Sequence, residues 1–434
     1  MSLNKLVHYF LVVTLIGSGF VSLYYRILGV KVFLFDFLGV LFIVIISIYF
    51  ISLNTIKSST LKEVSPLIFL ILLVFLTDTL SVLGVLSSGH QDSMGQFVKG
   101  ISHSMFLTVF IIFFLVFNAL NDYKYSKSYL KIFIFTMLLS CLYQFTSIFL
   151  DLGYDVNLDE IVWPLLSFGS WASNGQDAHI GSAGLTFVRH GGFAVNPNLL
   201  VAQLVSVIPI TLAVAKSSSI KTYLFIFVIF ILSMLATISR SGILSLGVVL
   251  VLYPVFFKVH KKNFINALSV SLTLVCLLLV VDWYLGLGVI NIIYKLLEIR
   301  INSEGYFDSS RFQLVLAGLD MWSNYPLFGV GLNNSQIMLE NYEISRSTGV
   351  NLHNYWLQIF VEKGIFVFPK IIYYVFIFYS SLRYRNIYGS SLALTLIALG
   401  VTGLMNNALA SPFIQVLLVV IFCAAVQERR RLLV

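Results

Sequence analysis

Residues 222–257 read TYLFIFVIFILSMLATISRSGILSLGVVLVLYPVFF, two apolar runs joined by the short polar connection TISRSG. A membrane-spanning helix needs about 20 mostly apolar residues. The runs 222–238 and 242–257 approach that length on either side of Arg240. The stretch therefore predicts two consecutive helical spans of a membrane protein.

The rest of the chain has the same character. Of its 434 residues, 59% are hydrophobic and 11% charged, and the mean hydropathy is +0.94, outside the range of soluble globular proteins. We expect a single all-α polytopic domain over 1–434 with about twelve transmembrane helices, the first retained because no cleavage site follows it. The windows are 7–25, 32–53, 65–87, 99–118, 129–150, 199–215, 222–238, 242–257, 265–285, 364–381, 389–405 and 411–427.

Charge predicts the orientation. With cytoplasmic N- and C-termini, fifteen of the 27 Lys and Arg fall in short inner loops and tails, as the positive-inside rule requires. Fourteen of the nineteen acidic residues then lie outside or at the outer ends of the helices. The net charge of +8 is therefore a topology signal and no evidence for nucleic acid. Cys141, Cys276 and Cys423 fall inside spans, dispersed, and are interpreted as packing residues.

Two outer connections are long, residues 151–198 and 286–363. Loops of this length in a compact protein are usually functional or disordered, and their tryptophans favour folding back onto the membrane surface. Within the second loop, apolar residues from Phe312 to Trp322 recur at helical spacing. Ser309 and Ser310 can cap the start of this helix and Asn324–Pro326 can end it, which predicts an amphipathic interfacial helix.

Arginines are expected at three points of the outer face: Arg240 in TISRSG, Arg311 at the start of the interfacial helix, and Arg189 before HGGFAVNPN. Each alone can extend to the lipid headgroups as an anchor. Together with His353, immediately before a span, they are harder to treat as separate anchors. Arginine offers a planar fork of donors to phosphate oxygens, and a phosphate at a membrane is most often a lipid headgroup or a polyprenyl diphosphate.

The role of His353 stays open between helix capping, beside the good cap residue Asn354, and chemistry as a general base or a donor to a phosphate. The turn after Arg189 and His190 can simply cap the next span through Asn196-Pro197. Arg189, His190 and Asn354 are nevertheless candidates for substrate binding. The outer loops lack ligand-spaced sets such as HExxH or DxD, so no metal or other cofactor is expected.

Three segments in order, TISRSG at 237–242, SSRFQLVLAGLDMWSNYPLFGVGLNN at 309–334 and HNYWLQIFVEKG at 353–364, resemble the signature region of the O-antigen ligase and polymerase superfamily of bacterial envelope glycosyltransferases. The resemblance covers mainly 190–410, and the first five helices match only in hydropathy. One departure is visible, because IFVFPK stands where the family often has another glycine after EKG.

The resemblance implies a C-type glycosyltransferase acting on an undecaprenyl-diphosphate-linked glycan at the outer face of the bacterial inner membrane. By position in the motifs, Arg240 and Arg311 correspond to the arginines that hold the diphosphate, and His353 to the essential histidine. A polymerase would pass the growing chain to the next lipid-linked repeat unit, with a chain-length regulator as a further partner. A ligase would pass it to lipid A-core.

Two long outer loops, each with an arginine, favour the polymerase, whose site must hold two lipid-diphosphate substrates. A twelve-helix transporter or flippase is the rival from another class; it would need internal repeats and charges near the midplane. Asp78 and Lys370 are the main mid-span charges, and either can instead pair with a neighbour. A scaffold would not need arginines and a histidine gathered on one face.

Overall fold

The computed structural model describes most of the chain. The ranges are 3–20, 24–27, 30–51, 61–89, 93–154, 156–166, 179–182, 185–188, 190–194, 196–217, 220–237, 239–258, 304–339, 342 and 352–433.

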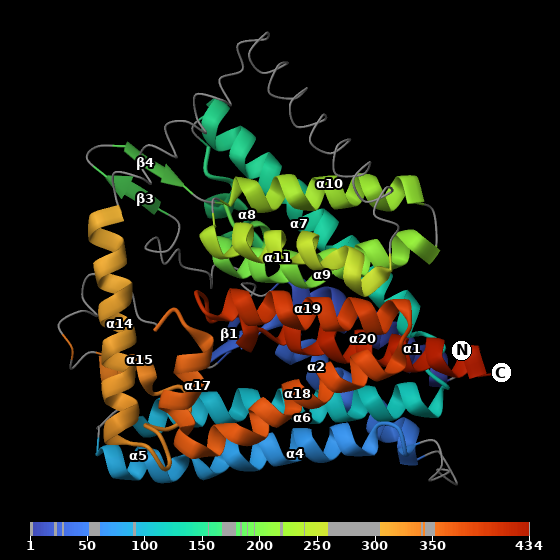
Figure 1. The fold of residues 1–434 in the computed structure, drawn as a ribbon, viewed down its shortest axis with the longest axis horizontal. Helices are drawn as coiled ribbons and strands as arrows, with labels where there is room; N and C mark the ends of the chain where they lie inside the picture. The colour runs from blue at the N-terminus through green and yellow to red at the C-terminus, as the bar shows by residue number, and fades with distance from the viewer. Residues whose placement is uncertain are drawn as a thin grey trace.

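Apolar helices make up the body of the molecule, and most of them lie side by side along its longest axis, with α7 running obliquely (Figure 1). In chain order they are α1 (Leu3–Gly19), α2 (Leu34–Ile51), α4 (Ser65–Leu80), α5 (Val82–Ser88), α6 (Ser93–Leu120), α7 (Ser126–Tyr154), α9 (Pro197–Ser217), α10 (Ile220–Ala236), α11 (Arg240–Phe257), α17 (Tyr355–Lys363), α18 (Phe368–Tyr384), α19 (Ile387–Gly403) and α20 (Pro412–Leu433).

The connections contain shorter elements. Among the described residues, two antiparallel hairpins, with strands of four residues each, interrupt the helical fold and close their backbone hydrogen bonds locally. These elements are β1 (Tyr24–Ile27) with β2 (Val30–Phe33), α8 (Leu158–Leu166), β3 (His179–Ser182) with β4 (Leu185–Val188), η1 (Gly192–Ala194), α14 (Glu304–Asn324), α15 (Ser335–Leu339), η2 (Gly364–Val367) and η3 (Ala408–Ala410).

The fold is that of a polytopic helical membrane protein. Among the described residues, seven helical stretches are long and apolar enough to cross a bilayer, and four further apolar helices are shorter. Eleven of the twelve predicted windows coincide with these helices. The window 265–285 lies outside the described residues.

The interior is apolar, and hydrogen bonds of serine and threonine side chains link the helices within it. Of the seven candidate spans in the described residues, those formed by α9 and α20 are the most enclosed, each with 83% of its apolar window buried. Lipid is as apolar as leucine, so membrane helices associate through close packing and interhelical hydrogen bonds. Thr395 Oγ1 in α19 donates to the Ser206 carbonyl of α9 over 3.2 Å, and the hydroxyls of Ser245 and Thr402 lie 2.8 Å apart.

α14 crosses one end of the bundle, roughly perpendicular to α4, α6 and α18, and the N- and C-termini lie at the opposite end (Figure 1). The predicted helix of the second loop is confirmed, but it begins at Glu304 and not at Ser309. No proline interrupts 304–310, so the helix extends through the serines predicted to cap it. It ends at Asn324, before Pro326, as predicted.

α14 has an apolar stripe on either side. Leu314, Ala317 and Met321 are buried against the segment that precedes and forms α17. A second stripe is exposed, and it comprises Phe312, Leu316, Leu319 and Trp322. Exposed apolar residues at this spacing fit a helix that lies in a membrane interface.

Candidate functional site

A polar cavity of about 420 Å³ lies beside His353. Residues far apart in the sequence form its wall, from the end of α1, the start of α2, α6, the start of α9 and the connection between α19 and α20. The lining residues are Ser18, Phe20, Phe35, Asp36, His103, Asn196, Asn198, Leu199, His353, Asn406, Asn407, Ala410, Ser411 and Pro412.

The local backbone fixes His353 at this cavity. Its φ of 49° is left-handed, a conformation that few residues other than glycine adopt and that is enriched at functional sites. The next residue, Asn354, caps α17 by accepting a hydrogen bond from the Leu357 amide over 3.1 Å. Capping therefore belongs to Asn354, and the predicted contact of Asn354 with substrate stays a prediction. His353 precedes the cap.

The start of α17 is anchored on its neighbours. The Tyr355 hydroxyl lies 3.0 Å from that of Tyr374 in α18, and Trp356 Nε1 donates to the Gly400 carbonyl of α19 over 3.0 Å. Both contacts are inside the bundle, so they hold the segment that carries His353 against α18 and α19.

The glycine turn of the second loop pairs with the EKG end of α17. Val330 N donates to Val361 O over 2.9 Å and Gly331 N to Glu362 O over 3.1 Å. Gly329 has a φ of +67°, and a Cβ there would lie 2.4 Å from the backbone of Glu362. Only glycine fits this crossing. The pairing of this turn with the end of α17 joins the C-terminal end of α14 to the helix that follows His353. It therefore fixes α14, which carries Arg311, relative to His353.

Two buried charges follow at the end of α17. Glu362 accepts hydrogen bonds from Ser335 Oγ over 2.7 Å and from Gln358 Nε2 over 2.8 Å. Lys363 forms a buried ion pair with Asp78 of α4, which also accepts from Ser104 of α6. Asp78 was a candidate for a transport role, and it instead pairs with a neighbour. Sequence reasoning missed Lys363 because its acidic partner lies 285 positions away.

The structure describes the three candidate arginines to different extents. Arg240 is the first residue of α11, and the preceding Ser239 Oγ lies 3.5 Å from Oδ1 of the cavity residue Asn198. Arg240 therefore begins its helix beside the cavity wall. Arg311 lies on α14, two helical turns before Gly318, which packs on Leu357; its side chain is outside the described set. Arg189 lies outside the described residues.

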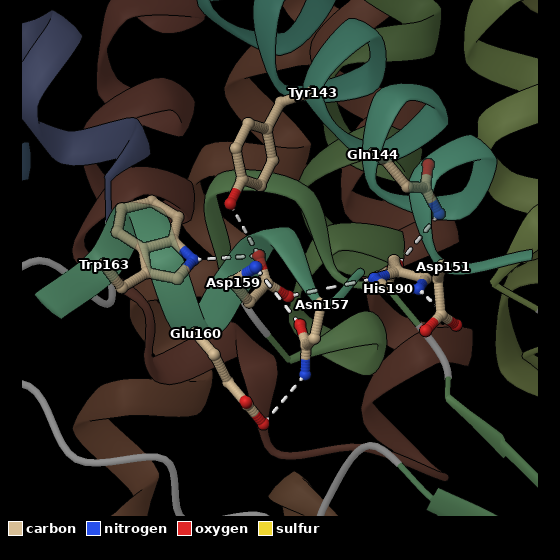
Figure 2. A network of polar contacts seen from close by, with 8 residues as sticks. All are labelled: Tyr143, Gln144, Asp151, Asn157, Asp159, Glu160, Trp163 and His190. Atoms are coloured by element: carbon tan, nitrogen blue, oxygen red, sulfur yellow. Dashed lines mark hydrogen bonds and ion pairs between the residues drawn. The ribbon is translucent and has the colours of Figure 1, made fainter. Parts of the chain in front are cut away.

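His190 sits between two carboxylates (Figure 2). Its Nε2 lies 3.2 Å from Asp151 Oδ2 at the end of α7, and its Nδ1 lies 3.9 Å from Asp159 Oδ2 in α8. Asp159 also accepts from the Tyr143 hydroxyl over 2.7 Å and from Trp163 Nε1 over 3.0 Å. The side chain of His190 is only 2% exposed, and its contacts link the connection between α7 and α9 to α7 itself.

The electrostatics of this link favour the charged imidazole. Burial lowers the pKa of His190, but the charges of Asp159 and Asp151 and the hydrogen bond with Asp151 outweigh it and leave the pKa above its usual value. A contact between His190 and substrate, as expected from the sequence, is not established by this geometry. The turn that follows is confirmed as a cap, since Asn196 Oδ1 accepts from Asn198 N over 2.8 Å at the start of α9.

The cavity also contains residues that sequence reasoning did not select. Asp36 and His103 lie in predicted spans of the first half of the chain, where the resemblance extended only to hydropathy. Asn407 and Ser411 lie in a short connection between two spans. In the sequence, these residues are recognisable only as polar residues near the ends of apolar runs. That pattern does not reveal which helices pack together to form a cavity.

Comparison with known proteins gives a consistent assignment. The chain matches the family model described as O-antigen ligase over residues 225–369, a range that contains Arg240, Arg311 and His353. A search of curated proteins finds no match. The match over residues 225–369 supports the resemblance to the O-antigen ligase and polymerase superfamily that the motifs predicted.

Proposed function

We propose that this protein is an O-antigen or related surface polysaccharide polymerase. It transfers the growing undecaprenyl-diphosphate-linked glycan onto the next lipid-linked repeat unit at the periplasmic face of the bacterial inner membrane. The N- and C-termini are then cytoplasmic. The family equally covers ligases, which transfer the glycan to lipid A-core. The polymerase is preferred because two long outer loops suit two lipid-diphosphate substrates.

The observation that carries the proposal is that His353, from one family motif, lines a cavity beside which Arg240, from another, begins its helix. A second cavity, about 280 Å³ and mostly apolar, lies between α18, α19 and α20. The two share the 409–412 connection, since Leu409 lines the apolar cavity and Ala410 the polar one. A polar space beside an apolar one suits a substrate that is both sugar and lipid.

In the proposed reaction, Arg240 and Arg311 bind the donor diphosphate and stabilise the charge that develops as it leaves. His353 removes the proton from the acceptor hydroxyl, whose oxygen bonds to the anomeric carbon. The bond from that carbon to the diphosphate oxygen breaks, and its electron pair departs with undecaprenyl diphosphate. Direct displacement inverts the anomeric centre. Arg189 is proposed to contact the second substrate, and His190 and Asn354 are proposed to contribute to substrate binding.

The proposed transfer is independent of metal ions because arginines neutralise the diphosphate in their place. Membranes treated with EDTA should therefore keep their activity. Loss on chelation that magnesium or manganese restores would contradict this part of the proposal.

The test of the diphosphate site uses Arg240→Ala and Arg311→Ala, with the protein level in the membrane measured for each. Either should lower polymer synthesis by about 10²- to 10³-fold, the loss typical of removing one preorganised donor to a developing anion. Arg240→Lys and Arg311→Lys should not restore it, since lysine lacks the planar fork. Arg383→Ala, at the exposed end of α18, is the matched control. Full-length polymer from both alanine variants would refute the site.

A further inference from the structure

We propose that Asn407 and Ser411 form a sugar-binding subsite in the polar cavity that His353 lines. Its ligand is an uncharged sugar unit, held through the sugar hydroxyls. The proposal rests on the proposed function for the identity of the glycan to which that sugar belongs. Both residues lie outside the segment matched by the family model, and the fold brings them to the cavity.

The two residues stand in the connection between α19 and α20, which the neighbouring helices hold in place. Asn406 Nδ2 donates to the Asn198 carbonyl at the start of α9 over 2.8 Å. Gln415 Nε2 of α20 donates to the Leu409 carbonyl over 2.7 Å. The connection is therefore anchored before η3 and within it, so the polar groups that it carries are preorganised for binding.

Ser411 directly precedes α20, a position at which a serine side chain usually accepts a hydrogen bond from an amide of the first turn. The carbonyl of Ser411 accepts from the amides of Ile414 and Gln415, each over 3.1 Å. Its hydroxyl, in contrast, has no hydrogen-bond partner among the described residues, although the residue is only 7% exposed. Buried hydroxyls rarely stay unsatisfied, so the Oγ is left for a group that enters the cavity.

The side-chain amide of Asn407 is in the same state. Its Oδ1 and Nδ2 are both enclosed, and neither has a partner within the part of the chain that the structure describes. Other asparagines of the cavity wall use their amides to hold the backbone, as Asn196 Oδ1 does with the Asn198 amide and Asn406 Nδ2 with the Asn198 carbonyl. An enclosed polar group without a partner is destabilising, and a ligand that satisfies it removes that cost.

These groups match a sugar better than a phosphate. An asparagine amide supplies an acceptor and two donors, and a serine hydroxyl both donates and accepts. Neighbouring sugar hydroxyls also donate and accept, so they can satisfy both residues. An ionised diphosphate only accepts, and it would leave Asn407 Oδ1 unpaired. Phe20 and Phe35 add apolar surface to the same cavity, and a pocket with a few placed polar groups suits a small ligand.

The subsite lies in the cavity of the proposed base. A general base must come within hydrogen-bond reach of the hydroxyl from which it removes the proton. A sugar held by Asn407 and Ser411 is confined to the cavity that His353 lines, where this condition can be met. In the proposed reaction that hydroxyl belongs to the acceptor. Asn407 and Ser411 thus position the acceptor sugar and take no part in the proton transfer.

The first experiment measures binding to the full-length protein in lipid nanodiscs. One probe is the lipid-free repeat-unit oligosaccharide released from the source organism's surface polysaccharide, with binding read by saturation-transfer NMR. The other is undecaprenyl diphosphate. Asn407→Ala and Ser411→Ala should each weaken oligosaccharide binding by about two- to tenfold, the loss typical of one neutral hydrogen bond, and the double variant should weaken it further. Undecaprenyl diphosphate binding should be unchanged.

A second experiment identifies the substrate that supplies the sugar. The transfer rate is measured in proteoliposomes with lipid-linked polymer as donor and a single lipid-linked repeat unit as acceptor, each varied in turn. Asn407→Ala should raise the KM for the single repeat unit. A rise confined to the KM for the polymer overturns the assignment to the acceptor and gives the sugar to the donor.

Ser391→Ala is the matched control, because Ser391 of α19 is also buried with an unsatisfied hydroxyl in the described structure but lines neither of the two cavities. The subsite is overturned if wild type does not bind the oligosaccharide or if the double variant binds it equally well. Equal loss in Ser391→Ala, or loss of both ligands, also overturns it, since either result indicates damage to the fold. Wild-type protein that binds the oligosaccharide but not undecaprenyl diphosphate refutes the proposed function and leaves the subsite standing.

Discussion

His353, His190 and His103 have different surroundings in the structure, and the sequence alone distinguishes them poorly. His353 was selected because it stands in a motif before a span, and the structure adds its left-handed backbone and its cavity. His190 was selected for its place beside Arg189, and its carboxylate partners depend on how α7 and α8 fold together. His103 had no local motif, so only tertiary structure could reveal it.

The prediction at this scale concerns the role of His353. If His353 is the general base, His353→Gln should lower turnover by about 10²- to 10⁴-fold and remove the acid limb of the pH-rate profile. Binding of undecaprenyl diphosphate should change little. The measurement is initial rate against pH for wild type and variant, in membranes that contain equal amounts of protein. A variant that loses donor binding yet turns over normally at saturating donor would assign His353 to the phosphate instead.

Among the elements, the spans were predictable and the short connections were not. Long apolar runs leave few alternatives to a helix in a membrane, because every backbone group must find a partner within the segment. The hairpins β1–β2 and β3–β4 were missed, since strands of four residues carry too little alternation to be recognised beside apolar helices. The start of α14 was misplaced because serine is compatible with both a cap and a helix interior.

A pH dependence is predicted for the attachment of α8 to α7. The pKa of His190 is raised in the folded protein, so its contribution to stability is fully present below the unfolded value of about 6.5 and is lost as pH rises through the folded value. At pH 6, α8 should exchange its amide hydrogens about tenfold faster or more in His190→Gln than in wild type, by loss of charge-assisted hydrogen bonds.

At pH 9 the two proteins should exchange at similar rates, since the wild-type imidazole is then neutral. Comparing both proteins at the same pH removes the intrinsic pH dependence of exchange. His8→Gln controls for the loss of a histidine. In wild type, His8 Nδ1 lies 2.9 Å from the Tyr129 hydroxyl, in another part of the bundle. A difference that is equal at both pH values would show that His190 acts only by packing.

For the whole molecule, the arrangement at the end of the bundle opposite the chain termini bears on which acceptor the proposed enzyme uses. β3, β4, α14 and α15 lie at the same end of the bundle, opposite the chain termini (Figure 1). Under the proposed function, the two long connections that contain these elements can each contact one of two lipid-linked substrates. A ligase also needs one lipid-linked donor, but its acceptor is a lipid A-core molecule. The distinction therefore appears in what accumulates when the protein is absent.

The last prediction follows from that difference. Deleting the gene in its source organism should leave single repeat units on undecaprenyl diphosphate and a surface glycan only one repeat long, because polymerisation stops while later steps continue. Gel electrophoresis of the surface glycan and mass spectrometry of the lipid-linked fraction measure this. Wild-type protein should restore the long-chain ladder, and Arg311→Ala at an equal membrane level should not. Long polymer trapped on undecaprenyl diphosphate, with bare lipid A-core at the surface, would instead establish a ligase.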